Sequence, residues 1–379
     1  MLNESVADAR MSPAAVWKMV EHLKGEALVA WRMADIAHRR SAEERNLSEP
    51  FPFGWYAVCY TDELQIGEVK PLRYLARDLV LWRGQDGTAR VLDAYCRHLG
   101  ANMAYGGFVE GNDLVCPFHA WAYDGTGAVT KIPYARNIPP QAKRADCVPA
   151  WQVAERNGLI WIWYHPKNAA PMWEIEAYPE IGAPGWTKLT KAEWRVFNNI
   201  RNLHDNTLDL AHFLYVHRLA TYPEAETVVE GPVLRSTTRT KFGTPKGVVD
   251  GAIVVHNLAP GQGAVRFVGI SETLLLNAIT PVEKDEVHAR FAFSQPEAEA
   301  EGPMGGVARA IIRDICKQFD QDKTIWDRMR YEPQPLICDG DGPIPMARAR
   351  YDLFLSDEAF ERSKGQIQRH NMKSRMPGQ

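Results

Sequence analysis

Two short segments of the chain place a cysteine beside a histidine. Cys96 and His98 are separated by one residue, and Cys116 and His119 are separated by two. Seventeen residues lie between His98 and Cys116. Thiolates and imidazoles are ligands for zinc and for iron–sulfur clusters. The spacing therefore predicts one metal-binding site built from two matching loops.

The arrangement of these four residues favours one kind of cluster. Zinc would take all four ligands around a single ion, as in a zinc knuckle. A Rieske [2Fe–2S] cluster instead takes two cysteines on one iron and two histidines on the other. The C-x-H and C-x-x-H spacings match the Rieske pattern, with one ligand of each kind from each loop. We weigh a zinc knuckle and a chance pairing as the alternatives.

A second group of possible ligands lies in the segment DNTLDLAHFLYVH, residues 205–217. Asp209, His212 and His217 stand there at the spacing D-x-x-H-x-x-x-x-H. Two imidazoles and one carboxylate on one face of iron leave positions open for oxygen. On an ideal helix His217 does not share a face with His212, so it needs a distorted or ending helix. The alternative is that both histidines are packed structural residues.

The carboxylate for this second site is expected from a later helix, predicted over residues 308–329. Its apolar residues step by three and four, and Asp322 falls within that stripe. Asp320 lies about 200° further round the helix and is predicted to face outward. Asp322 is therefore the predicted ligand and Asp320 the second choice. An aspartate at the edge of the stripe that pairs with Arg313 is the structural alternative.

The rest of the sequence predicts elements that position these groups. Residues 51–165 alternate short strands with turns, including a hairpin over residues 79–96, so a small all-β domain is expected. Residues 228–295 contain long alternating strands, typical of an antiparallel sheet. A helix is predicted over residues 13–45, and the polar tail after about residue 362 predicts little regular structure.

Composition limits the class of protein. The chain has 379 residues with a formal net charge of −3, which gives no indication of a nucleic-acid partner. We find no stretch long enough for a membrane span and no secretory signal. The other four cysteines are scattered, which fits a cytoplasmic protein better than a disulfide framework. No glycine-rich dinucleotide motif follows a strand, so NAD(P)H and flavin are expected on a separate reductase.

The segments VLDAYCRHLGANM, LVCPFHAWAYDGTG and IPYARNIPPQAK resemble the Rieske domain of ring-hydroxylating oxygenases. The likeness runs from about residue 51 to 354 and is greatest to the sterol-modifying Rieske oxygenases, which include 3-ketosteroid 9α-hydroxylase. It implies an α+β fold: an all-β Rieske domain, then a catalytic domain with helices over a curved antiparallel sheet (helix-grip, START-like). We place the boundaries at 1–46 for a helical extension, 47–165 for the Rieske domain and 166–379 for the catalytic domain.

The resemblance also implies roles for particular residues. The family's cluster ligands correspond to Cys96, His98, Cys116 and His119, and its two iron histidines to His212 and His217. The segment QDKTIW, which contains Asp322, resembles the one that supplies the third iron ligand. In that family a head-to-tail trimer places one chain's cluster beside the next chain's iron, and an aspartate matching Asp209 bridges the two. The alternative for Asp209 is a structural role at the start of a helix.

The implied activity is that of a terminal oxygenase. It would use O2, and electrons relayed from NAD(P)H by a reductase, with a ferredoxin as an optional carrier, to hydroxylate a bulky hydrophobic compound. The resemblance points to a steroid or sterol. Demethylation or ring hydroxylation of another bulky compound is the first alternative, and a Rieske electron-transfer protein or a zinc-bound structural protein is an alternative of another class. The pocket is expected between the sheet and the iron helices, with walls formed by Phe213, Leu214, Val216, Phe267, Leu275 and Phe291.

Overall fold

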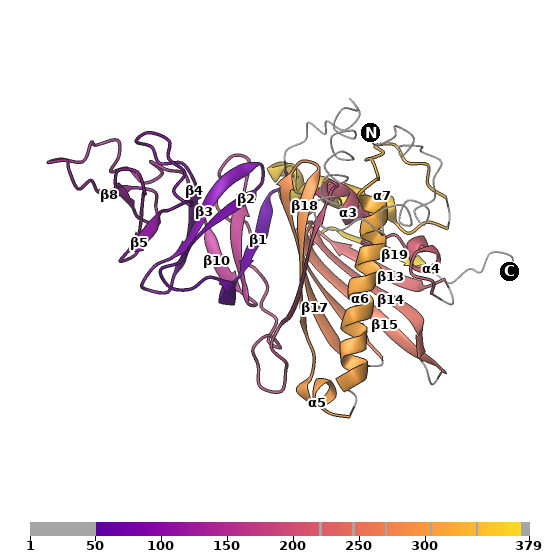
Figure 1. Cartoon of the computed structure of the whole chain (residues 1–379). Helices are drawn as coiled ribbons and strands as arrows, with labels where there is room; N and C mark the ends of the chain where they lie inside the picture. Colours follow the sequence, from indigo (N-terminus) through magenta and orange to yellow (C-terminus); the bar gives the residue numbers. More distant parts are fainter. Residues whose placement is uncertain are drawn as a thin grey trace, which may run out of the picture.

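The computed structural model describes residues 51–372, except residues 220, 221, 245, 246, 270, 304 and 339. The chain forms two lobes that lie side by side (Figure 1). Residues 51–164 form the β lobe, which contains no long helix, and residues 190–372 form the sheet–helix lobe. The predicted helix at residues 13–45 lies outside the described residues.

The β lobe consists of three small antiparallel sheets, in the strand orders β1-β11-β10, β2-β3-β4-β9 and β5-β6-β7-β8. The hairpin predicted over residues 79–96 is confirmed, since β3 pairs with β4. Trp82 is fully buried between the strands. The elements of this lobe are β1 (Gly54–Tyr60), η3 (Thr61–Glu63), β2 (Val69–Tyr74), β3 (Arg77–Arg83), β4 (Ala89–Asp93), β5 (Phe108–Glu110), β6 (Asp113–Val115), β7 (Ala122–Tyr123), β8 (Val129–Lys131), β9 (Ala150–Trp151), β10 (Val153–Arg156) and β11 (Leu159–Tyr164).

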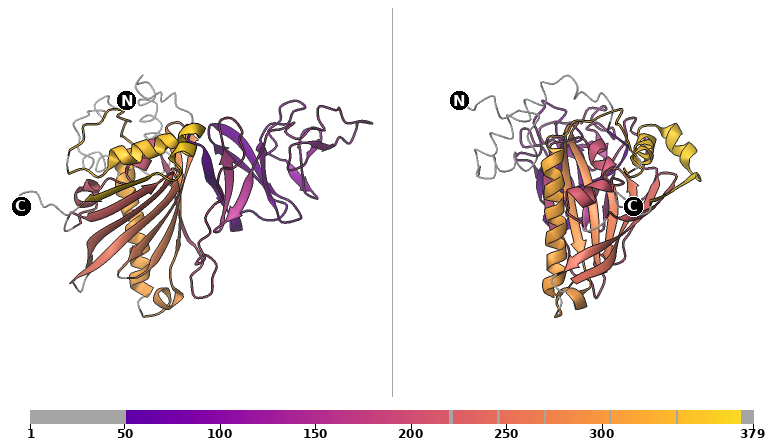
Figure 2. Two further views of the ribbon diagram at one scale, coloured as in Figure 1. Left: turned by 180° about the vertical axis from the view of Figure 1, so that it is seen from behind. Right: turned by 90° about the vertical axis from the view of Figure 1, so that its right-hand side faces the viewer.

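The sheet–helix lobe contains one antiparallel sheet in the order β12-β18-β17-β16-β15-β14-β13-β19. A long helix, α6, lies across one face of this sheet (Figures 1 and 2). This is the α+β architecture expected from the sequence. The elements are β12 (Thr190–Val196), α3 (Ile200–Asp205), α4 (Ala211–Tyr215), β13 (Glu224–Glu230), β14 (Val233–Thr244), β15 (Gly247–Ala259), β16 (Gln262–Val268), β17 (Thr273–Glu283), β18 (Glu286–Ser294), α5 (Glu297–Ala300), α6 (Gly305–Trp326), α7 (Ile344–Leu353), α8 (Asp357–Ser363) and β19 (Ile367–Met372).

Alternate residues of the central strands face α6, and we call this the helix-side face. Leu275 and Ile279 of β17 share an apolar cluster with Phe319 of α6. The residues that alternate with this set along β17, Leu276 and Ala278, belong to a different cluster on the opposite face. This alternation follows from the two-residue period of a strand. It fixes which side chains can meet a molecule bound between the sheet and the helices.

The segment that carries the paired histidines is not one helix. The sequence pattern predicts a helical stretch at residues 204–217, but α3 ends at Asp205 and α4 begins at Ala211. The Asp209 carboxylate accepts the backbone N–H groups of Ala211 and, at a longer distance of 3.4 Å, His212. A side chain that binds its own backbone in this way competes with a continuous helix. The expectation that the helix ends before His217 is confirmed.

The C-terminal tail corrects the sequence-based expectation. It forms β19, which pairs antiparallel with β13 at the edge of the large sheet. Most side chains of β19 are exposed, so the segment carries no apolar pattern. Backbone pairing with a neighbouring strand supplies the order that its side chains do not indicate.

A partly buried polar cluster joins the two lobes. His288 of β18 contacts the Tyr74 hydroxyl through Nδ1 at 2.8 Å and Glu193 through Nε2 at 3.0 Å. Arg290 donates to the Tyr74 hydroxyl, so that hydroxyl has its own proton free to donate to His288 Nδ1. The Glu193 carboxylate can only accept, so Nε2 of His288 carries a proton, and burial of the imidazole favours the neutral form, in which Nδ1 accepts from Tyr74.

This neutral histidine predicts a pH dependence of stability. Burial lowers the pKa of His288, despite the opposing effect of the hydrogen bond that Glu193 accepts from it. The unfolded chain thus binds more protons as the pH falls below about 6.5, and stability falls with it. We expect the urea midpoint to be lower at pH 5.5 than at pH 7.5. His288→Gln, which retains a donor and an acceptor, should make this difference smaller, whereas an equal difference in both proteins would contradict the assignment.

No helix among the described residues is long and apolar enough to cross a membrane.

Candidate functional site: two metal-binding centres

The two Cys/His loops have the same backbone form. In the first, the N–H of Cys96 donates to the carbonyl of Ala101 and its carbonyl accepts from Gly100. In the second, Cys116 makes the same two bonds with Trp121 and Ala120. Gly100 and Ala120 both have a positive φ, 77° and 56°, which turns each loop back sharply. Each turn brings its cysteine and histidine toward the other loop.

The four side chains are sorted by type. Cys96 and Cys116 are both buried and lie close enough to interact, and burial raises the pKa of the Cys116 thiol. The rings of His98 and His119 lie together nearer the surface, with centroids 4.7 Å apart. His98 Nδ1 is buried and has no hydrogen-bond partner. Paired thiols below paired imidazoles fit a cluster that has one sulfur-ligated and one nitrogen-ligated iron.

Two neighbours of the Cys/His loops were not identified from the sequence. The Tyr123 hydroxyl lies 3.0 Å from Cys96 Sγ, and Trp121 stacks on the His98 ring with an interplanar angle of 6°. Hydrogen bonds to ligand sulfurs tune the potential of an iron–sulfur cluster. For Trp121, the signal in the sequence was an aromatic residue two positions after the predicted ligand His119.

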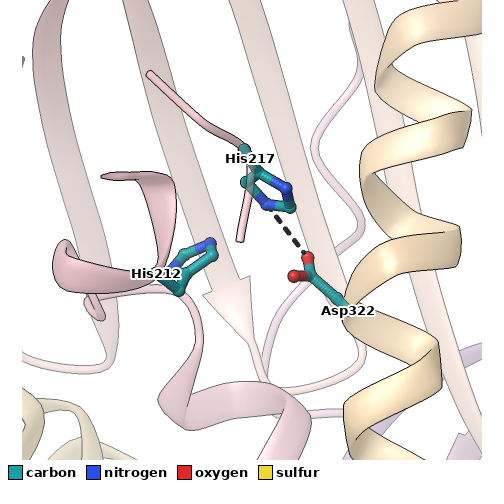
Figure 3. Close-up of side chains that lie close together, drawn as sticks. All are labelled: His212, His217 and Asp322. Atoms are coloured by element: carbon teal, nitrogen blue, oxygen red, sulfur yellow. Dashed lines mark ion pairs between the residues drawn. The ribbon is translucent and has the colours of Figure 1, made fainter. Parts of the chain in front are cut away.

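His212, His217 and Asp322 converge in the sheet–helix lobe. Their ligand atoms all lie within 4.8 Å of one another, and the three side chains point toward a common space (Figure 3). His217 Nε2 lies 3.4 Å from Asp322 Oδ2. The histidines come from α4 and the residues after it, and the carboxylate comes from α6. Two imidazoles and one carboxylate form the donor set of non-haem iron oxygenases.

The second nitrogen of each imidazole also has a neighbour. His217 Nδ1 lies 3.0 Å from the Gln321 side-chain oxygen, so Nδ1 carries the proton and Nε2 is free to bind a metal. Burial opposes the charged form of His217, yet Asp322 and Gln321 raise the pKa of its imidazole. A site that attracts a proton to Nε2 of His217 also attracts a metal cation. No pattern in the sequence singles out Gln321.

Asp209 lies beside the Nδ1 atom of His212. Its Oδ2 is 3.6 Å from His212 Nδ1, longer than a hydrogen bond, and that nitrogen has no other partner. Burial alone would raise the pKa of Asp209, but His212 and two backbone N–H groups lower it below its ordinary value. The carboxylate is therefore ionised and can only accept. Within one chain, Asp209 therefore accepts from the backbone N–H groups of Ala211 and His212 and also lies next to the His212 imidazole.

The other aspartates in α6 and directly after it have different partners. Asp322 is buried, as the helical pattern predicts, whereas Asp320 is exposed and accepts a hydrogen bond from Trp194 at 2.8 Å. Asp314 accepts from Gln318 on the surface. Asp327 is bound by Lys323 and by the backbone N–H of Phe197. Asp322 is thus the carboxylate of this helix that faces the histidines.

Within one molecule, the two centres lie on opposite sides. The Cys/His loops belong to the end of the β lobe around β5 to β8, and α4 lies at the far side of the other lobe (Figure 1). Apolar side chains are exposed around the Cys/His loops, among them Leu99, Tyr105, Phe118 and Tyr134. Exposed patches of this kind mark interaction surfaces.

The fold and the two centres define a Rieske oxygenase. The chain matches the Rieske [2Fe-2S] domain over residues 54–149 and the 3-ketosteroid 9alpha-hydroxylase C-terminal domain over residues 162–355. It belongs to the Rieske oxygenases that carry this C-terminal domain and is an enzyme of that class.

The relatives with similar sequences include two groups. It is 31% identical over 340 residues to a probable 3-ketosteroid-9-alpha-monooxygenase, oxygenase component, of Rhodococcus rhodochrous, with 82% of this chain and 81% of the relative covered. It is 35% identical over 359 residues to a cholesterol 7-desaturase of Ciona intestinalis, covering 86% and 73%. The crystal structure of dicamba monooxygenase bound to dicamba, 22% identical, superposes with a TM-score of 0.68 over 81% of this chain and 98% of that one, which shows a shared fold.

Proposed function

We propose that this protein is the terminal oxygenase of a multicomponent system that acts on a steroid or sterol-like compound. The observation that carries the proposal is the convergence of His212, His217 and Asp322 in a chain that also contains a Rieske domain. A protein that only transfers electrons has no use for the second centre. The names of the relatives support the substrate class, because both groups act on a steroid skeleton.

The proposal assigns each side chain a role. Cys96, His98, Cys116 and His119 hold a [2Fe–2S] cluster, and His212, His217 and Asp322 hold iron(II). A bound cluster would supply single electrons, and a bound iron would supply oxygen activation. Gln321 and Asp209 orient the two iron-binding imidazoles by facing their Nδ1 atoms. We also propose that the domain boundaries lie after residues 46 and 165.

The distance between the centres supports a head-to-tail trimer. One chain's Cys/His loops would lie against the α4 region of the next chain, and three such contacts close a ring. Asp209 would then accept from His212 of its own chain and from His119 of the neighbouring chain. The exposed apolar side chains around the loops fit such a contact. A monomer in sedimentation would overturn the assembly.

Electrons would come from NAD(P)H through a separate reductase. The oxygenase-component names of the bacterial relatives support such a partner. Hydroxylation is the favoured reaction, and desaturation is a second candidate because the match to a cholesterol 7-desaturase reaches 35% identity. Both draw on the same two centres, and the product distinguishes them.

The test is reconstitution. The purified protein, with about three irons per chain, is combined with a heterologous reductase and NADH and supplied with a panel of steroids, sterols and aromatic ethers. Mass spectrometry should show a steroid product with one added oxygen, or with two hydrogens removed for desaturation. Turnover of the aromatic ethers alone would overturn the substrate class, and a colourless zinc protein would overturn the whole proposal.

The cluster ligands give a separate prediction. Cys96→Ser is expected to abolish the visible absorbance of the cluster, because a hydroxyl does not replace a thiolate on iron. His119→Ala should do the same. Cys147→Ser is the matched control, since Cys147 packs against the same core and is assigned no ligand role. A red-brown Cys96→Ser protein would show that the ligand assignment is wrong.

A further inference from the structure

A buried polar group lies unpaired on the helix-side face of the large sheet. Asn277 of β17 stands between Leu275 and Ile279, both of which face α6, so its side chain faces the same way. Its Oδ1 is buried and has no hydrogen-bond partner among the residues that the structure describes. A buried polar atom without a partner is costly, and its presence in a largely apolar wall calls for a ligand or a water.

A second amide lies two strands away in the same row. Asn257 of β15 is opposite Gly263 of β16, which is in turn opposite Asn277. Asn257 Oδ1 accepts a hydrogen bond of 3.1 Å from the buried Arg350. Because a guanidinium can only donate, the oxygen of Asn257 must face Arg350 and its Nδ2 must face away. Asn257 therefore presents a donor toward Gly263.

Gly263 leaves the place between the two amides unfilled. A Cβ at this position would lie 3.6 Å from Cγ and Nδ2 of Asn257, at ordinary contact distance. Gly263 and the next two residues on its face, Val265 and Phe267, remain partly exposed. A donor and an unpaired amide thus flank a gap in the wall, bordered by apolar side chains.

This row lies close to the proposed iron site. Asn277 is directly opposite Phe291 of β18, whose ring centroid is 4.8 Å from that of Phe319. Asp322 follows Phe319 by one turn of α6, on the same face. A molecule that reaches the iron-binding residues from the sheet side would therefore meet Asn277.

We propose that Asn277 and Asn257, on either side of Gly263, bind an oxygen atom of the substrate and so set which carbon of the skeleton faces the iron. This inference rests on the proposed function and narrows it to hydrophobic compounds with a ketone or hydroxyl group. Asn257 Nδ2 donates to the oxygen of either group. Asn277 accepts from a hydroxyl through Oδ1, or donates to a ketone after rotation of its amide.

The test compares three ligands that differ in one oxygen: 5α-androstane, 5α-androstan-3-one and 5α-androstan-17-one. Equilibrium dialysis with the iron-loaded protein gives their dissociation constants. Asn277→Ala should weaken binding of at least one ketone about 10- to 100-fold and change binding of the hydrocarbon less than about threefold. Leu275→Ala, the neighbour on the same face, should weaken all three ligands alike.

Gly263→Ala provides a second variant that keeps both amides. The added methyl group fits the fold, so the thermal midpoint should be unchanged, but it fills the gap and should weaken the same ketone. Equal affinity of the wild type for all three ligands, or an equal loss in Asn277→Ala, would mean that Asn277 holds only a water and would overturn the inference. The proposed function would then still stand if a steroid product forms. Binding of none of the three would overturn the inference and also count against the substrate class.

Discussion

Asp322→Ala is expected to yield a red-brown protein that contains about two irons per chain in place of three and forms no product. The Cys/His loops lie in the other lobe, so the absorbance of the cluster should not change. The proposed iron site loses its carboxylate, leaving two imidazoles, and the loss of activity should be at least about 100-fold. Iron analysis, the visible spectrum and product formation together measure the effect.

The side chain of Asp320 offers the control. It is two residues away on α6, exposed, and bound to Trp194. Asp320→Ala should cost about 1 kcal/mol of stability at most and retain all the iron and the activity. Loss of iron from Asp320→Ala, with full iron in Asp322→Ala, would refute the assignment of the ligand. Loss of colour in Asp322→Ala would show that the two centres are not separate.

The second large effect is expected at Asp209. Asp209→Asn can still accept the backbone N–H groups of Ala211 and His212 through its oxygen, but its other atom becomes a donor. It therefore cannot accept from the imidazole N–H of His212 and from that of a neighbouring His119 together. We expect a stable trimer with its full iron content and a turnover about 100-fold lower.

Single-turnover mixing of the reduced protein with substrate and oxygen measures this effect directly. In the wild type the cluster should reoxidise within the turnover, whereas in Asp209→Asn it should stay reduced. Asp209→Ala loses the backbone contacts as well and should also be less stable by about 1 kcal/mol. If Asp209 serves only the backbone, Asp209→Asn will turn over normally, and the bridge is then refuted.

Part of this structure follows from local sequence pattern. The two-residue period predicted the antiparallel sheet of residues 228–295, and the hairpin at 79–96 followed from its turn. The 3.6-residue period of α6 placed Asp322 inward and Asp320 outward, as the structure has them. These features depend on residues close together in the chain, so their period is visible without the fold.

The strand of the tail, and part of the helix break, depended on contacts from distant segments. A close approach of Gly342 to the Leu208 carbonyl, which leaves no room for a Cβ, accompanies the break between α3 and α4. The polar segment Ile367–Met372 became a strand because β13 offered it an open edge. Both partners are distant in sequence, so the strand of the tail was not visible from a local window, whereas the end of the helix before His217 was expected.

The sequence by itself determined the types and spacings of the proposed ligands, and hence the two kinds of centre that we propose. Only the tertiary structure decided that α4 and α6 bring His212, His217 and Asp322 within 4.8 Å, that Gln321 orients His217, and that Asn257 and Asn277 flank Gly263. The physical reason is that ligand chemistry belongs to each residue, while the distance between two elements depends on how their apolar faces pack across the sheet.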